Sequence, residues 1–128
     1  FMSATVEGYG INGIVTTLDA TMTPLMSLTF EVERSGWLVA RIICRRVADG
    51  VAKVWDFGLG FKRDSGDVVA FGVNLNHTKG VASDQAALVA TDVTISATGN
   101  DVVVNVVGLA GTELDWAGTL SGEAVVHV

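Results

Sequence analysis

The stretch from Asp92 to Leu120 constrains the fold of this chain more than any other segment. Two runs rich in β-branched residues flank Gly99-Asn100, and a Gly-rich corner leads from the second run into Trp116. Short β-branched runs separated by Gly and Asn are typical of antiparallel hairpins. Such a segment builds a sheet and catalyses nothing by itself, which favours a structural or binding module.

Turn-forming residues recur at short intervals along the rest of the chain, and β-branched and aromatic runs lie between them. This pattern predicts an all-β fold, an antiparallel, jelly-roll-like β-sandwich of about eight strands. No segment has the period of a long helix, although Ser83–Ala90 is a candidate for a single helical turn. The strands that we expect are Leu25–Val32, Trp37–Val47, Ala52–Lys62, Val68–Asn74, Val89–Ala97, Val102–Val107, Leu114–Leu120 and Glu123–Val128.

Two of these strands show which side chains should form the core. Between Trp37 and Arg45 one alternating set is wholly apolar, and it consists of Leu38, Ala40, Ile42 and Cys44. Because successive strand residues point to opposite faces, this set should be buried. The Val102–Val107 strand is apolar on both faces apart from Asn105, so one set of its valines should lie between sheets or subunits.

The chain has 128 residues, a length that fits one domain. We expect a Gly-rich arm over residues 1–14 and a single sandwich over residues 15–128. A short strand near Ala4–Val6 or Gly13–Thr17 would add to a sheet edge. Hydrophobic residues make up 49% of the chain and charged residues 17%, so another subunit should cover some apolar surface.

The composition argues against several classes of function. A net charge of −6 repels polyphosphate, so we expect no nucleic acid as partner. No apolar run approaches the roughly 20 residues that a membrane-spanning helix needs. The single cysteine, Cys44, has no partner for an internal disulfide, which is compatible with assembly in a reducing cytoplasm.

Two short motifs suggest cofactor or metal binding at first sight. Gly8–Gly13 matches the spacing GxGxxG, but a β-like run follows it where a dinucleotide site needs a helix. Asp64–Asp67 has too few oxygen ligands for calcium and fits a hairpin turn better. We therefore expect no cofactor and no metal.

An enzyme is also disfavoured. Triad chemistry needs a nucleophile, a histidine and a carboxylate, and the two histidines are His77, in an expected loop, and His127. A small hydrolase built on His77 with Asp64 or Asp67 is the catalytic alternative. The serines lack a nucleophile-elbow motif, so we expect the protein not to be an enzyme.

Several motifs in order resemble a β-domain that recurs in tailed-bacteriophage virion proteins. They are Thr16-Thr17 followed by Asp19–Thr23, the strand ending Ala40–Arg46, Val51–Trp55 leading to Phe61–Arg63, and a closing segment with Gly99-Asn100, Val102–Val107, Val107–Gly111 and Trp116. The resemblance extends over roughly Val15 to Val126. It departs at Met22, where the family usually has Pro, and at Asp84–Ala87, where it usually has an aromatic residue.

The resemblance implies a tail-fibre, neck, baseplate or capsid-decoration module, located in the virion and assembled in the host cytoplasm. Its partners would be copies of itself, often in a homotrimer, and other virion proteins. It implies no catalytic residues.

The candidate binding residues support two alternatives. Arg41 and Arg45 point to one side of their strand and should pair with Glu31, Glu33 or Asp56 on neighbouring strands, or bind an anionic group. Trp37 is the tryptophan most expected to be exposed, whereas Trp55 and Trp116 fit a core or interface. A receptor- or glycan-binding tip would instead use Tyr9, Trp37, Asn74, Asn76 and His77.

Overall fold

The computed structural model describes residues 5–71, 77–83 and 88–126 and contains nine strands in that part of the chain. The strands are β1 (Thr5–Thr17), β2 (Met22–Thr29), β3 (Arg34–Arg46), β4 (Ala52–Arg63), β5 (Val69–Phe71), β6 (His77–Ala82), β7 (Asp92–Thr98), β8 (Asp101–Val107) and β9 (Leu114–Val126).

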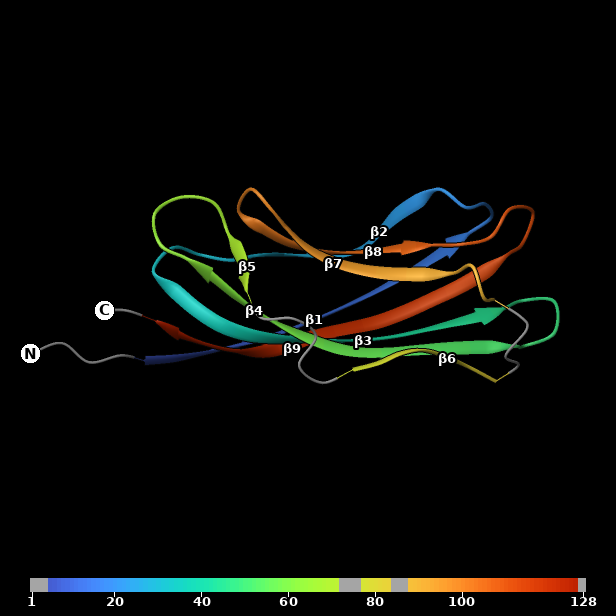
Figure 1. The fold of residues 1–128 in the computed structure, drawn as a ribbon, viewed down its shortest axis with the longest axis horizontal. Helices are drawn as coiled ribbons and strands as arrows, with labels where there is room; N and C mark the ends of the chain where they lie inside the picture. The colour runs from blue at the N-terminus through green and yellow to red at the C-terminus, as the bar shows by residue number, and fades with distance from the viewer. Residues whose placement is uncertain (1–4, 72–76, 84–87, 127–128) are drawn as a thin grey trace, which may run out of the picture.

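The strands form two antiparallel sheets that face each other (Figure 1). The large sheet has the order β1-β9-β3-β4-β5, and β6 also pairs with β4. The small sheet has the order β2-β8-β7 and covers one face of the large sheet. This arrangement confirms the expected all-β antiparallel sandwich.

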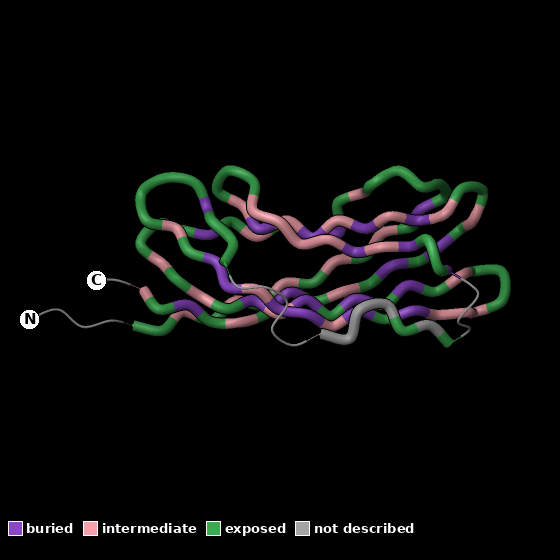
Figure 2. Tube along the Cα trace, viewed as in Figure 1, coloured by how far each residue is buried: buried purple, intermediate pink, exposed green. Residues whose placement is uncertain are grey.

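The core lies between the two sheets, where the buried segments of both layers meet (Figure 2). The alternating set expected from the sequence is buried: Leu38, Ala40 and Cys44 have no exposed surface, and Ile42 has 3%. In β8 the set Val102, Val104 and Val106 is fully buried. The predicted burial of one valine face between sheets is therefore confirmed.

A pair of tryptophans fills the centre of this core. The Trp55 and Trp116 rings stack with their centroids 5.5 Å apart, and both side chains are almost fully buried. The Trp116 indole N–H donates a hydrogen bond of 2.9 Å to Thr17 Oγ1, so its polar atom is satisfied inside the core. The expectation that these two tryptophans are core residues is confirmed.

The ends of the chain differ most from the expectation. From Thr5 onward the segment expected as an arm belongs to β1, which pairs with β9 along its whole length. Gly8–Gly13 is extended strand with no helix after it, so the geometry of a dinucleotide site is not present there. The two strands expected near the carboxyl end are one continuous strand, β9.

The middle of the chain also differs in two places. The loop expected around His77 begins β6, which pairs with β4. The strand expected over Val68–Asn74 is described only as the short β5, and Asn74 lies outside the described residues. Residues 88–90 form a turn, while the central part of the expected helical turn, residues 84–87, lies outside the description.

Candidate functional site

The outer face of the large sheet points away from the small sheet and exposes many apolar side chains. The register places one alternating set from each long strand on this face, with Ile14, Ala117, Ile43 and Val54 side by side across β1, β9, β3 and β4. Nine large apolar side chains on it are exposed: Val6, Ile14, Trp37, Ile43, Val54, Val69, Phe71, Val81 and Val125. We call these residues and the strand positions between them the outer face.

Glycines make part of the outer face flat and allow two aromatic rings to lie across it. A Cβ atom added at Gly58 would lie 3.1 Å from the Trp37 ring, and one added at Gly60 would lie 2.7 Å from the Phe71 ring. Trp37 and Phe71 are 37% and 49% exposed. Together with Val6, Ser35, Glu123 and Val125 they line an open, mostly apolar hollow.

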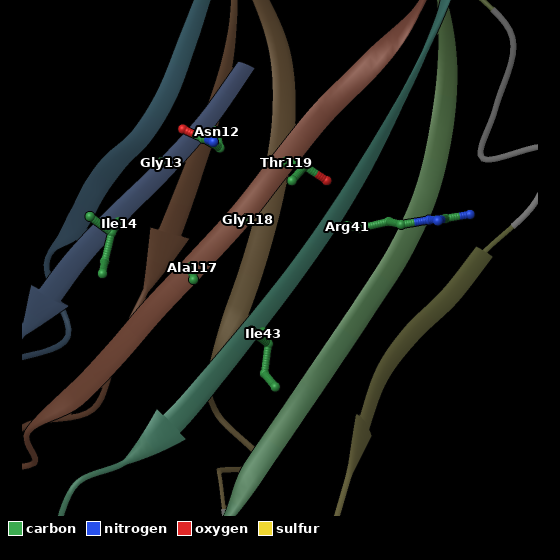
Figure 3. Close-up of a pocket in the computed structure, with 8 residues that line it drawn as sticks. All are labelled: Asn12, Gly13, Ile14, Arg41, Ile43, Ala117, Gly118 and Thr119. Atoms are coloured by element: carbon green, nitrogen blue, oxygen red, sulfur yellow. The ribbon is translucent and has the colours of Figure 1, made fainter. Parts of the chain in front are cut away.

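A second shallow hollow lies between β1, β9 and β3 (Figure 3). Asn12 and Ile14 come from β1, Ala117 and Thr119 from β9, and Arg41 and Ile43 from β3. The Arg41 Nε atom lies 3.4 Å from Asp56 Oδ2 on β4. This confirms one of the expected cross-strand pairs, and because both groups are well exposed the pair contributes little stability.

The charges on the outer face balance. Arg41, Arg45 and Lys62 carry positive charge, and Asp56, Asp115 and Glu123 carry negative charge, all at outward register positions of described strands. The whole chain carries −6. The acidic excess therefore lies elsewhere, and the outer face is close to neutral.

The structure places some of the candidate binding residues together and separates others. Trp37, Arg41 and Arg45 share the outer face, and the Arg45 guanidinium lies over Gly50. Trp37 is exposed, as expected. The side chain of His77 is not described, and Asn74 and Asn76 lie outside the described residues.

Tyr9 lies on the opposite side of the large sheet from Trp37. Its ring stacks on Phe30 at 5.5 Å and packs against the core, so Tyr9 and Trp37 do not form a shared platform. The Tyr9 hydroxyl is enclosed and has no partner at ordinary hydrogen-bond geometry. Burial, followed by interaction with the nearby Glu7 carboxylate, raises the pKa of Tyr9.

Glu7 is held by Arg34. The guanidinium donates two hydrogen bonds to the carboxylate, Nε to Oε1 at 3.1 Å and Nη2 to Oε2 at 3.0 Å. These hydrogen bonds lower the pKa of Glu7 and raise that of Arg34. The pair connects β1 with β3 across β9.

Sequence reasoning missed two residues that the structure makes prominent. Phe71 was not recognised as a neighbour of Trp37, because only the pairing of Gly60 with Phe71 brings the two rings together. Lys53 is 7% exposed, and its Nζ atom donates to the carbonyls of Leu88 and Thr91 at 3.0 and 3.1 Å. The sequence did contain a signal for the burial of Lys53. Lys53 lies two residues before Trp55 in an alternating strand, so both side chains point to the same face.

No group of three or more His, Cys, Asp or Glu side chains in the described part of the chain is placed to hold a metal ion. The backbone of His77 pairs opposite Phe57 of β4, seven positions before Asp64 in the sequence. The side chain of His77 is not described, so the hydrolase alternative built on His77 with Asp64 or Asp67 stays an untested prediction.

Comparisons with known proteins give only distant similarities. No protein-family model matches the chain, and no curated protein is significantly similar to it in sequence. The tailspike protein of Acinetobacter baumannii phage AM24 is 11% identical over 98% of this chain and 26% of the tailspike, with a TM-score of 0.47. The tailspike gp49 of A. baumannii bacteriophage Fri1, a capsular polysaccharide depolymerase, is 12% identical over 94% of this chain and 19% of the tailspike, with a TM-score of 0.40.

The chain thus spans about a quarter or less of the length of these tailspikes. No helix in the described part of the chain is long and apolar enough to cross a membrane. Fold and surface together define an all-β sandwich module with a nearly neutral face on its large sheet that exposes many apolar side chains.

Proposed function

We propose that this chain is a structural module of a tailed-phage virion, which assembles with copies of itself through the outer face. The observation that carries the proposal is the set of exposed apolar side chains on that face, contributed by six strands. Exposed apolar patches of this extent typically mark a protein interface. The phage assignment rests on the resemblance of the ordered motifs between Val15 and Val126.

The size of the outer face is sufficient for a stable contact. β1, β9, β3 and β4 lie side by side, and each has 12 or 13 residues. With strands about 4.8 Å apart and about 3.3 Å per residue, these four strands span roughly 800 Å². That is about the area that each partner buries in an ordinary specific interface.

The balance of charge favours a second copy of this chain as the occupant. Two chains of charge −6 repel each other in general, but their outer faces present equal numbers of cations and anions. A close to neutral face can meet its own copy without repulsion and can form complementary pairs.

Light scattering of matched variants tests this proposal. The face variant Val39→Lys/Val54→Lys adds two charges to the outer face, and we expect it to be smaller than the wild-type oligomer. The control Ser27→Lys/Ser96→Lys adds the same charge to the far side of the small sheet and should keep the wild-type size. A monomeric wild type, or a face variant of unchanged size, would contradict assembly through this face. A wild-type oligomer of three chains would match the homotrimer that the family resemblance implies.

The second candidate function is a receptor- or glycan-binding tip. The hollow between Trp37 and Phe71 supports it, because exposed aromatic rings beside Ser35 and Glu123 suit stacking and hydrogen bonding to a sugar. Glycan-array binding that is lost in both Trp37→Ala and Phe71→Ala would support this function. A blank array beside a stable oligomer would exclude it.

A further inference from the structure

The free edge of β1 differs from the other sheet edges in the described part of the chain. β1 has 13 residues, and β9 is the one described strand that pairs with it. An edge strand presents unpaired N–H and C=O groups to any strand that approaches. A long edge strand is therefore a docking site unless something blocks it.

The other edges in the described part of the chain carry features that block pairing. β6 has six residues, and its register with β4 shifts between Val54 and Trp55. β2 contains Pro24, and its register shifts between Pro24 and Met26. β5 has only three residues. β7 begins with Asp92, and its alternate positions are polar. Proline, irregular register, short length and charge are the usual means by which proteins protect sheet edges.

β1 has none of these features. It contains no proline, lysine or arginine, and its pairing with β9 continues without a shift. Its one charged residue, Glu7, is bound to Arg34 of the same chain. The edge therefore presents no free charge that would repel an identical edge.

The side chains of β1 fit an antiparallel copy of the same strand. Nothing lies within 4 Å of a Cβ atom added at Gly8 or Gly10, so the outer side of the strand is open there. Ile14 is 82% exposed on the same side. A two-fold axis through Ile11 sets Gly8 opposite Ile14 of the other copy and Gly10 opposite Asn12, so Ile14 and Asn12 each meet a glycine.

We infer that β1 pairs antiparallel with β1 of a second copy, across a two-fold axis at Ile11. The contact joins two large sheets into one continuous sheet and two outer faces into one larger surface. Backbone hydrogen bonds supply the attraction, and the opposition of Ile14 to Gly8 fixes the register. The inference rests on the proposed function in one respect: both take a second copy of this chain as the partner.

Site-specific disulfide formation tests the register directly. A full-length Gly8→Cys protein is mixed with an Ile14→Cys protein and oxidised, and we expect the mixed disulfide in large excess over either like-with-like disulfide. Directly opposite strand residues have Cα separations that a disulfide can bridge. The native Cys44 does not compete, because it is fully buried and burial raises its pKa to about 11.

Ala117→Cys provides the matched control for this experiment. Ala117 lies beside Ile14 in the register but one strand further from the edge. It should form no disulfide with Gly8→Cys. Absence of the mixed disulfide, or equal yields from the Ile14 and Ala117 variants, would overturn the inference.

Charge exchange at the two-fold axis tests the β1 contact in solution. Because Gly10 and Asn12 also lie on the outer face, the result that identifies the β1 contact is recovery in a mixture of the two variants. Gly10→Lys/Asn12→Lys sets lysines of the two copies opposite each other, and Gly10→Glu/Asn12→Glu does the same with carboxylates. We expect each variant alone to lose the β1 contact and an equal mixture to regain it, measured by native mass spectrometry.

If both edge variants keep the wild-type assembly and only Val39→Lys/Val54→Lys reduces it, the edge contact is wrong and the outer-face proposal stands. If the edge variants lose association and the face variant does not, the outer-face proposal is wrong and the β1 edge contact stands. A monomeric wild type overturns both.

Discussion

The indole of Trp116 shows how single residues make this core specific. Its ring stacks on Trp55, and its N–H is satisfied by one hydroxyl group, that of Thr17. Thr17 is 4% exposed, so water has little access to replace that hydroxyl. The hydrogen bond also fixes the end of β1 against β9, where the outer face and the free edge meet.

Replacement of the Thr17 hydroxyl should therefore be costly. Thr17→Val leaves a buried N–H without an acceptor, and we expect the free energy of unfolding to fall by about 1–3 kcal/mol. Thr17→Ser keeps an acceptor and should lose less. Urea unfolding measures both variants. In the Trp116→Phe background the difference between Val and Ser at position 17 should largely disappear, and an unchanged difference would contradict the role of this hydrogen bond.

A pH effect is expected at the β3–β4 turn. Arg46 donates two hydrogen bonds to the Asp49 carboxylate, and the Val51 N–H donates a third, which together lower the pKa of Asp49 from 3.8 to about 2. A lowered folded-state pKa stabilises the protein above the unfolded-state pKa, and this stabilisation is lost as the pH falls through the folded-state value.

The comparison of wild type with Asp49→Asn over pH isolates this contribution. We expect the wild type to be more stable at neutral pH, and the difference to shrink as the pH falls from about 4 to about 2. Thermal unfolding of both proteins across this range measures it. A difference that stays constant with pH would show that the carboxylate charge is not involved.

At the scale of elements, local alternation predicted the central strands well. The apolar set of β3 and the Val strand β8 lie where their sequence places them, because each has one wholly apolar face. The glycines of β9 hid its continuity. A Cβ atom at Gly122 would clash with the Trp37 carbonyl, so this glycine allows close strand packing and does not end the strand.

The sequence could not show which strands pair when they lie far apart along the chain. The β-like run that follows Gly8–Gly13 gave no register, so its full pairing with β9 was not foreseen. The candidate surface was foreseen in part through Trp37 and Arg41, while Tyr9, grouped with Trp37 in the binding-tip alternative, lies on the other side of the large sheet. A strand's alternation groups residues by face but does not say which neighbouring strand shares that face.

Lys53 links β4 to the turn before β7. The hydrogen bonds of its ammonium group with Leu88 and Thr91 hold residues 88–91 against the large sheet, and burial lowers its pKa. The Lys53 Nζ atom also lies 5.1 Å from the centroid of the Trp55 ring. Lys53→Met keeps an unbranched apolar side chain at this position and removes the hydrogen-bond donors. Because it also removes a buried charge, global stability should change little while the turn loosens.

Amide hydrogen exchange can detect this local loosening. We expect the Thr91 N–H, which donates to the Leu88 carbonyl, to exchange faster in Lys53→Met, while amides in β8 keep their wild-type rates. Equal exchange of Thr91 in both proteins would show that Lys53 does not hold the turn.

At the scale of the whole molecule, β9 links the three parts on which the proposed assembly depends: the outer face, the edge strand β1 and the core. It lies between β1 and β3, contributes Ala117 and Thr119 to the outer face, and supports the free edge of β1. Leu114, Trp116 and Leu120 of the same strand are fully buried. The assembly surface therefore cannot exist before β9 is in place.

Division of the chain at Gly111 tests this dependence. Gly111 is exposed in the turn before β9, so a cut there separates β9 from the other strands without dividing any strand. Loss of a buried Leu costs about 2–5 kcal/mol and loss of a buried Trp about 3–5 kcal/mol, so removal of all three is comparable to the roughly 5–15 kcal/mol that stabilises an ordinary domain. We expect the fragment 1–111 to be unfolded by circular dichroism and tryptophan fluorescence. Addition of a peptide of residues 112–128 should restore both signals and, with them, the self-association of the intact chain. A fragment that folds and associates without the peptide would place the assembly surface elsewhere in the sandwich.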